Sequence, residues 1–300
     1  MNDQKLAEWM VKEKRKAVFG CAATATFKNG HAGLWFDRFG TVAAKGGGGR
    51  EIPGAQSLVW VKDTVQKYMG ARAALGDALD ACHTRLEALV LRLGGLSLKA
   101  SLSHEWTRFV TGMGRPHPVG NGLAWHPTLA VPYLPGSGVK GLTLSWARDW
   151  QEADQETVAR IFGPNKEEMT KQPAGGSQAH IGSVIFLDAL PIKPPEISAE
   201  IITPHGNNSG PPQDAGRPNP IGFLAAKSMT LRFYFLPATT HQNVQLQPGA
   251  DRVQPSDQAA RDVDAARRWT AEALQVTGAG AKTKLGYGRF TETSDDAPSD

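Results

Sequence analysis

Chemically active groups are concentrated near the C-terminus, where residues 278–290 read GAGAKTKLGYGRF. The stretch combines glycines, cations, a hydroxyl and an aromatic ring. A backbone without Cβ atoms can approach another group closely, and successive N–H groups on such a turn bind anions. The pattern therefore predicts contact with a chain of phosphate groups, made by backbone N–H groups and by the surrounding cations. The candidate contacts are Gly278, Gly280, Lys282, Thr283, Lys284, Gly286, Tyr287 and Arg289.

The same stretch has a structural interpretation that needs no ligand. A helical pattern ends at Val276, and residues 287–290 are typical of a short closing strand. The glycines between them fit a helix cap followed by a tight hairpin. Both interpretations place the stretch at a helix-to-strand turn, so they differ only in whether an anion binds there.

Two nucleotide-binding motifs are near matches. A Walker A loop requires glycines at the two positions where this chain has Val276 and Ala281, ahead of Lys282. The run 136–141 satisfies the G-x-G-x-x-G pattern, but the next convincing strand starts only at Ile181. That distance is too long for a compact dinucleotide-binding unit. A nucleotide-binding enzyme is therefore kept only as an alternative.

Apolar periodicity predicts the elements that position this turn. From Leu58 to Leu93 the spacing is helical, and Gly94 and Gly95 end it. One stripe on this helix predicts a core or subunit-interface face: Leu75, Leu79, Cys82, Leu86, Leu89 and Leu93. We further expect helices after Ser137 and at 155–162 and 257–276, strands at 96–102, 106–111, 181–190 and 221–237, and loops at 112–122 and 192–220.

A second group of candidate contacts lies at the start of the helix after Ser137. Ser137 is a favoured N-cap residue, whose hydroxyl is expected to accept from the amide of Lys140. Lys140 then lies in the first turn, where a cation opposes the helix dipole, so a ligand contact explains it better than stability does. We therefore group Ser137, Gly138 and Lys140 with the glycine-rich turn. The buried face of this helix is predicted to be Val139, Leu142, Thr143, Trp146 and Trp150.

Charge and composition restrict the kinds of partner. The formal net charge is +4, and the acidic tail 291–300 contains no Lys or Arg, so the rest of the chain is more basic. This balance suits a nucleic-acid partner without requiring one. No apolar run approaches membrane-spanning length and the basic start lacks the core of a signal peptide, so we expect a cytoplasmic protein. Cys21 and Cys82 form no metal or disulfide pattern, and no acidic cluster suits magnesium, so no cofactor is expected.

Several short motifs together resemble the RAMP superfamily of CRISPR systems. Within it, the chain resembles the family of the sixth subunit of the type III-B (Cmr) effector complex. The motifs occur in the family's order at 120–127, 131–141, 161–163, 186–191, 202–205, 218–224 and 278–290. The Thr-Pro-His at 203–205 and the Gly-Ala-Lys-Thr at 280–283 are specific to that subunit. Residues 206–209 read GNNS where the family tends to carry aromatics, and the first ninety residues match only through 32–37.

The resemblance implies an α+β fold with a ferredoxin-like, RRM-related RAMP core at 96–290. A helical extension at 1–95 packs on this core, an irregular insertion occupies 192–220, and an acidic tail at 291–300 is expected to be disordered. The implied function is a non-catalytic subunit that binds guide RNA near its 3′ end, and target RNA, beside the backbone RAMP subunits. No stable homo-oligomer is expected. Further RNA-binding candidates are Arg115, His126 and Arg148.

Some RAMP proteins are endoribonucleases that process the guide RNA precursor with a histidine as general acid or base. This chain has His104, His117 and His126 ahead of the helix that follows Ser137. No tyrosine or lysine lies at a short spacing from any of them, and His126-Pro127 reads as a structural turn. The nuclease is therefore the alternative function.

Overall fold

The computed structural model describes residues 30–38, 43–44, 50–51, 54–113, 121–164, 181–202, 221–238, 244–245 and 254–294. The predictions for Arg115, His117, the first 29 residues and the last six residues of the acidic tail fall outside this part of the chain. Within the described residues, no helix is both long and apolar enough to cross a membrane.

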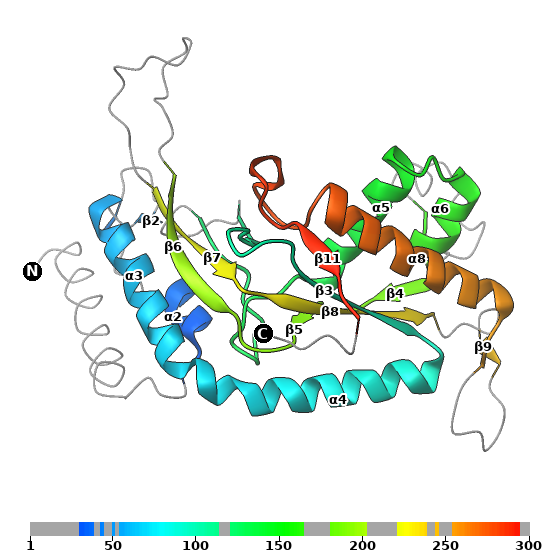
Figure 1. Ribbon diagram of the computed structural model, residues 1–300, viewed down its shortest axis with the longest axis horizontal. Coiled ribbons are helices and arrows are strands. Elements are labelled where there is room, and N and C mark those ends of the chain that lie inside the picture. The colour runs from blue at the N-terminus through cyan, green and yellow to red at the C-terminus, as the bar shows by residue number, and fades with distance from the viewer. Residues whose placement is uncertain are drawn as a thin grey trace, which may run out of the picture.

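An antiparallel sheet forms the centre of the described chain (Figure 1). Its strands lie in the order β11-β3-β8-β4, and β5 pairs with another part of β8. They are β3 (Leu96–Leu102), β4 (Val184–Phe186), β5 (Leu190–Pro191), β8 (Thr230–Pro237) and β11 (Phe290–Glu292). Helices α5 (Gly136–Asp149) and α6 (Gln155–Phe162) connect β3 to β4, and α8 (Asp257–Val276) connects β8 to β11. The α+β class expected from the sequence is confirmed.

The N-terminal part of the chain adds helices, and the segment between β5 and β8 adds a second sheet. The helices are α2 (Ala32–Arg38), α3 (Gly54–Ala71), the 3-10 helix η2 (Arg72–Leu75) and α4 (Gly76–Leu93). β6 (Glu196–Ile202) and β7 (Ile221–Lys227) form the second sheet, against which α3 packs. Two short ladders complete the description: β1 (Ala43–Ala44) with β2 (Arg50–Glu51), and β9 (Val244–Gln245) with β10 (Gln254–Pro255).

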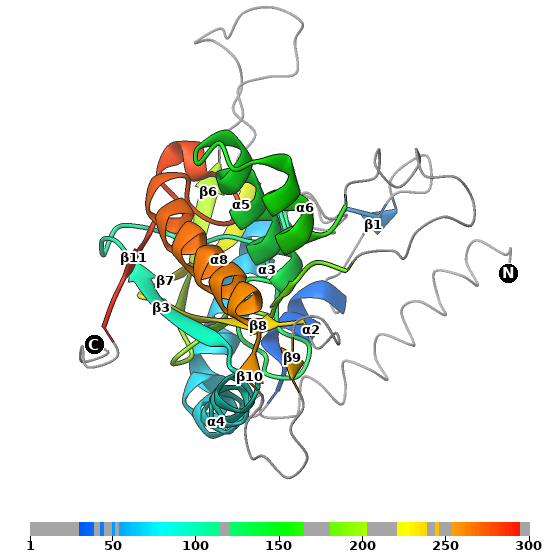
Figure 2. The ribbon, with the colours of Figure 1, turned by 90° about the vertical axis from the view of Figure 1, so that its right-hand side faces the viewer.

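Helices cover both faces of the central sheet. α8 packs on one face with α5 beside it, and α4 packs on the other, as two views at right angles show (Figure 1, Figure 2). Leu231, Phe233 and Phe235 of β8 belong to the core that includes α8. Tyr234, between them in sequence, packs with Val90 of α4. The alternation predicted along this strand is therefore present, but each face of the strand meets a helix.

The region 192–220, predicted to be irregular, contains one regular strand. β6 pairs with β7 along its whole length. The prediction was wrong here because the prolines bracket a proline-free run at 196–202, whose isoleucines favour a strand. Residues 203–220 lie outside the described chain, so the rest of this prediction stays open.

Other predicted elements are interrupted. The single helix expected over 58–93 is α3 and α4, joined by η2. The strand expected over 181–190 is divided into β4 and β5, because Asp188 leaves the ladder to cap α5. The strand expected over 221–237 breaks at Ser228, whose φ is 50°. Residues 106–111 form no strand and pair only through an isolated bridge at Phe109.

The apolar stripe of α4 faces the core of the chain itself. Leu79 is fully buried and packs with Leu129, Val131 and Leu190, and Leu86 lies beside this group. The prediction of a core face is confirmed for these residues, but Leu89, which belongs to the same stripe, is 39% exposed. The chain itself therefore does not cover the whole stripe, and the subunit interface stays a prediction.

His83 lies on the buried side of α4, facing the central sheet. Its Nε2 is 2.8 Å from the carbonyl oxygen of Pro191, which can only accept a hydrogen bond. Nε2 therefore carries the proton of the neutral ring, and Nδ1 accepts from the Tyr234 hydroxyl at 2.5 Å. The ring is held as a neutral link between helix and sheet.

Burial lowers the pKa of His83, although the Pro191 carbonyl and the carboxylates of Glu87 and Asp80 oppose this shift; Arg232 adds to it. The unfolded chain, with a histidine pKa near 6.5, then binds a proton more readily than the folded one. We expect the free energy of unfolding to decrease as the pH falls below about 6.5. Urea unfolding at a series of pH values measures this, and His83→Gln should weaken the dependence. An unaltered dependence in that variant would assign the titration to other groups.

Candidate nucleic-acid interface

The predicted phosphate-binding stretch is the connection between α8 and β11, and we call residues 278–289 the glycine loop. α8 ends at Val276 as predicted, but β11 begins only at Phe290, so most of the strand predicted at 287–290 is a turn. A 3-10 helix, η3 (Thr283–Leu285), lies at the middle of the loop. In Figure 1 the glycine loop is the red segment that projects beyond the C-terminal end of α8.

The four glycines of this loop adopt conformations that other residues avoid. Their φ angles are 77° at Gly278, 84° at Gly280, 87° at Gly286 and 68° at Gly288. Lys282, which is not a glycine, also lies in the left-handed region, with φ of 60°. Glycine is therefore required by backbone geometry, independently of any ligand.

The close backbone approach predicted for the glycines occurs within the chain. A Cβ on Gly280 would overlap the carbonyl oxygen of Val110, and one on Gly288 would overlap that of Ala279. This corrects the physical reason given above, which attributed the missing Cβ atoms to an approaching anion. The helix cap and the tight turn of the ligand-free interpretation are both present.

Most N–H groups of the glycine loop already have acceptors. Ala281 donates to the carbonyl oxygen of Val110 at 2.7 Å, and Gly288 donates to that of Arg108 at 2.6 Å. Within the described part of the chain, the N–H groups of residues 282–284 have no hydrogen-bond acceptor. The N–H groups of Gly280, which is exposed, and of Arg289 likewise have no acceptor among the described residues. The loop therefore offers an anion the consecutive N–H groups of 282–284 together with that of Gly280.

The three cations of the loop differ in availability. The Nζ of Lys282 lies 4.8 Å from the centre of the Phe223 ring, and partial burial lowers the pKa of this amine. Arg289 donates from Nη1 to the carbonyl oxygen of Gln275 at 3.2 Å. Lys284 is exposed and makes no hydrogen bond or ion pair with any described residue. Lys284 is thus the cation best placed to meet a ligand.

Tyr287 is directed into the protein. Its ring lies 6.5 Å from that of Phe223 and packs on the main core, and burial, followed by the charge of Glu200, raises its pKa. Thr283 is half-buried, and no hydrogen bond of its hydroxyl occurs among the described residues. Packing therefore accounts for Tyr287, which leaves little ring surface for a base.

The start of α5 is capped differently from the prediction. The helix begins at Gly136 after the N-cap Pro135, and Asp188 accepts from the Gly136 N–H at 2.7 Å. Ser137 is exposed and makes no capping hydrogen bond. The carboxylate has taken the role expected for the serine hydroxyl, because tertiary structure brings it to the helix N-terminus. Lys140 is half-buried in the first turns.

The predicted buried face of α5 is wrong at one residue, Trp150. Trp146 is buried as expected, but Trp150 is 58% exposed and stacks on it with ring centres 5.1 Å apart. Arg148 is also exposed, in the last turn. A Cβ added to Gly138 would lie 3.0 Å from the side chain of Leu134, which precedes α5.

The two predicted groups of contacts are linked by intervening segments. Ala281 of the glycine loop bonds to Val110, and the neighbouring Thr111 accepts from the N–H of Ala124 at 2.9 Å. Thr111 also donates from Oγ1 to the carbonyl oxygen of Tyr133 at 3.0 Å, just before α5. In the described chain no hydrogen bond joins the glycine loop directly to Ser137, Gly138 or Lys140, so a shared groove is still a prediction.

The sequence profile of the RAMP superfamily matches residues 72–291, which include the central sheet, α5, α8 and the glycine loop. This chain belongs to the RAMP superfamily. The resemblance derived from short motifs is thereby confirmed, and the match begins at η2, inside the N-terminal extension predicted at 1–95.

Comparison with individual RAMP proteins gives a similarity to Cmr6. The chain is 30% identical over 115 residues to the CRISPR system CMR subunit Cmr6 of Saccharolobus solfataricus, covering 38% of this chain and 35% of that protein. The chain thus spans about a third of the length of this relative. A chain of the type III-B Cmr-beta complex bound to cognate target RNA superposes with a TM-score of 0.56 at 18% identity, over 79% of this chain and 72% of that one, which shows the shared fold. Cmr6 from Pyrococcus furiosus gives a TM-score of 0.35 at 23% identity, over 66% of this chain and 98% of that one.

Two histidines of the nuclease alternative, His126 and His104, lie in different environments. His126 is half-buried, its Nδ1 accepts from the N–H of Leu129 at 3.2 Å, and burial lowers its pKa. The ring of Tyr133 meets it edge-on at 5.2 Å. His126 thus organises the turn that was predicted, although the structure adds a tyrosine that sequence spacing did not reveal. His104 is exposed and stacks on Trp106, a residue that sequence reasoning had assigned to a strand.

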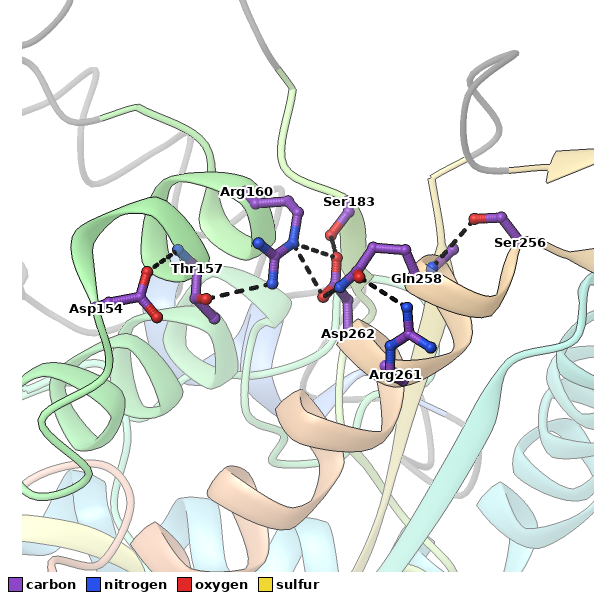
Figure 3. Close-up of polar contacts among 9 residues, drawn as sticks. Asp154, Thr157, Arg160, Ser183, Ser256, Gln258, Arg261 and Asp262 are labelled. Atoms are coloured by element: carbon purple, nitrogen blue, oxygen red, sulfur yellow. Dashed lines mark hydrogen bonds and ion pairs between the residues drawn. The ribbon is translucent and has the colours of Figure 1, made fainter.

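A buried carboxylate organises the far end of the RAMP core (Figure 3). Asp262 of α8 is only 2% exposed and receives Nε of Arg160 at 3.2 Å. It also accepts from Ser183 at 2.6 Å and from Gln258 at 2.8 Å. Each carboxylate oxygen has partners, so this group holds α6 and the start of β4 to α8. In the described chain, no group of acidic, histidine or cysteine side chains could hold a metal ion.

Proposed function

We propose that this chain is a non-catalytic, RNA-binding, Cmr6-like subunit of a type III-B CRISPR effector complex. In this proposal it contacts guide RNA near its 3′ end, meets the target RNA, and lies beside backbone RAMP subunits without forming a stable homo-oligomer. The observation that carries the proposal is the RAMP match across 72–291, which contains the glycine loop, together with the sequence similarity to Cmr6.

The topology supports a ferredoxin-like, RRM-related core. Taken in chain order, β3, β4, β8 and β11 are connected by α5 and α6, by the β5–β7 region, and by α8. The first and third of these strands lie at the centre of the sheet and the fourth and second at its edges, and every neighbouring pair is antiparallel. This arrangement is that of a split strand–helix–strand fold.

Lys284 is the phosphate contact that the geometry favours most. It is exposed and uncommitted among the described residues, whereas Lys282 lies over Phe223 and Arg289 bonds to a backbone carbonyl. Those two cations must leave their present partners to reach a phosphate. Removing Lys284 alone is therefore expected to have a larger effect on binding than removing either of the others.

We expect Lys284→Ala to weaken the binding of single-stranded RNA equally for unrelated sequences, because phosphate contacts do not read bases. The slope of log affinity against log salt concentration should become shallower by about 0.7. Fluorescence anisotropy of labelled RNA over a salt series measures both quantities. Arg85→Ala, which removes one charge from the exposed side of α4, is the matched control.

Two other results would contradict the proposal. A folded Lys282→Ala, Lys284→Ala variant with wild-type affinity at every salt concentration would show that the glycine loop binds no RNA. Cleavage of labelled repeat RNA by the purified protein, abolished by His126→Ala or His117→Ala, would favour the endoribonuclease. Purification from the native host tests the complex, since RNA and partner subunits should accompany the chain.

A further inference from the structure

An indole ring lies exposed beside the glycine loop. Trp106 is 67% exposed. This is a large fraction for an aromatic side chain, since such side chains usually bury most of their apolar surface. A Cβ added to Gly286 would lie 3.6 Å from the six-membered ring of Trp106, so the indole edge lies next to the backbone of the glycine loop. The residues just before Gly286 are Lys284 and Leu285, and both are exposed. A flat apolar ring and an uncommitted cation therefore share one surface.

The ring is held in place before any ligand arrives. His104 stacks on one side of the indole, with ring centres 5.2 Å apart and an angle of 12° between the planes. The turn that carries both rings is closed by a bond from the Thr107 N–H to the His104 carbonyl at 2.9 Å. Another bond, from the Ser103 N–H to the Arg289 carbonyl at 3.0 Å, ties this turn to the end of the glycine loop. A preorganised ring loses little conformational freedom on binding.

We propose that Trp106 is a base-stacking site for single-stranded RNA. The side of the indole away from His104 receives one unpaired base, and Lys284 meets a phosphate of the same strand. This inference rests on the proposed function. It adds a residue that contacts a base, whereas Lys284 contacts only the charged phosphate. Stacking of this kind tolerates any base, since every base has a π face.

The charges around the ring favour RNA over a protein partner. Lys284 lies in the adjacent loop without a partner among the described residues, and Arg289 begins the connection to β11. Of the acidic groups nearby, Glu200 is paired with Arg108 at 3.2 Å. Glu105, next to Trp106, is exposed, so one carboxylate stands against the cations Lys284 and Arg289 on this surface. A cation beside an exposed ring is the combination that single-stranded nucleic acids require.

The test compares Trp106→Ala with Trp150→Ala in the full-length protein. Trp150 is a suitable control because it is 58% exposed and stacked on a neighbouring ring, but lies at the end of α5. Anisotropy titrations with labelled single-stranded RNA should show about 10-fold weaker binding for Trp106→Ala and no change for Trp150→Ala. The salt slope should stay at the wild-type value for both, because neither variant removes a charge. Trp106→Phe should keep most of the affinity.

A second ligand isolates the stacking contribution. RNA with abasic positions keeps its phosphates but offers no base, so wild-type protein should bind it more weakly, and Trp106→Ala should bind both RNAs alike. Wild-type affinity in Trp106→Ala overturns the inference, and if Lys284→Ala still weakens binding the proposed function stands. If Trp106→Ala keeps RNA affinity but fails to assemble with partner subunits, the ring is a protein contact and the inference is also overturned. If neither residue matters, both the site and the inference fall.

Discussion

Gly280→Ala is expected to destabilise the folded protein by about 3 kcal/mol or more. The φ of Gly280 is 84°, which alanine avoids, and its Cβ would overlap the carbonyl oxygen of Val110. That carbonyl already accepts from Ala281 at 2.7 Å, so the backbone cannot move away without losing a hydrogen bond. Urea unfolding followed by circular dichroism measures the change. A valine at this position should be worse still.

Gly70→Ala is the matched control for this prediction. Gly70 lies near the end of α3, and an added Cβ there meets nothing within 4 Å. Alanine should therefore leave stability unchanged or raise it by about 0.5–1 kcal/mol. A Gly280→Ala variant as stable as the wild type would mean that the glycine loop packs differently from the structure. Loss of RNA binding in Gly280 variants is consequently no evidence for a direct RNA contact.

The second large effect is expected at the buried carboxylate of Figure 3. Asp262→Ala leaves the Arg160 guanidinium, the Ser183 hydroxyl and the Gln258 amide without their shared acceptor. Breaking a buried ion pair from one side costs about 3–5 kcal/mol. We expect the lower end of this range, about 3 kcal/mol, because the Arg160 side chain is 35% exposed and water can solvate it. The free energy of unfolding in urea is the measurement.

Asp264→Ala provides the comparison, since Asp264 lies on the same helix and is also paired with an arginine. Its bond to Arg268 is 2.9 Å long, but the two side chains are 51% and 58% exposed. Loss of this surface pair should change stability by less than about 0.5 kcal/mol. Similar effects at the two positions would show that burial does not distinguish them, and would contradict the role given to Asp262.

Elements with strong local signals could be predicted from the sequence. β3, α6 and α8 have the predicted bounds, since apolar and polar residues alternate along the whole of β3 and both helices have a capping residue and an amphipathic face. Predictions failed where a distant group decided the outcome. Asp188 interrupts the strand predicted at 181–190 because its carboxylate accepts from the Gly136 N–H at the start of α5. The local sequence at 181–190 does not show that this helix N-terminus lies nearby.

In the candidate site, too, local features could be predicted from the sequence and features that depend on distant residues could not. The glycines were found because their composition is local, but the reason for them was not, since the carbonyl of Val110 comes from another part of the chain. Equally, Lys282 and Lys284 look equivalent in sequence, and only the position of the Phe223 ring separates them. Trp106 was predicted to begin a strand, and the sequence does not show the turn, closed by the bond from the Thr107 N–H to the His104 carbonyl, that exposes its ring.

Helix α4 has a consequence for how any RNA can lie on this protein. In RRM domains, RNA is spread over an open sheet whose aromatic side chains stack several bases at once. Here α4 occupies the equivalent surface, and Tyr234 of β8 is buried beneath it. If RNA binds as we propose, it finds no open sheet on this face and is expected to follow the rim of the domain. Contacts of that kind would be made to the RNA backbone and would not read the order of the bases, which would suit the proposed binding of a guide RNA.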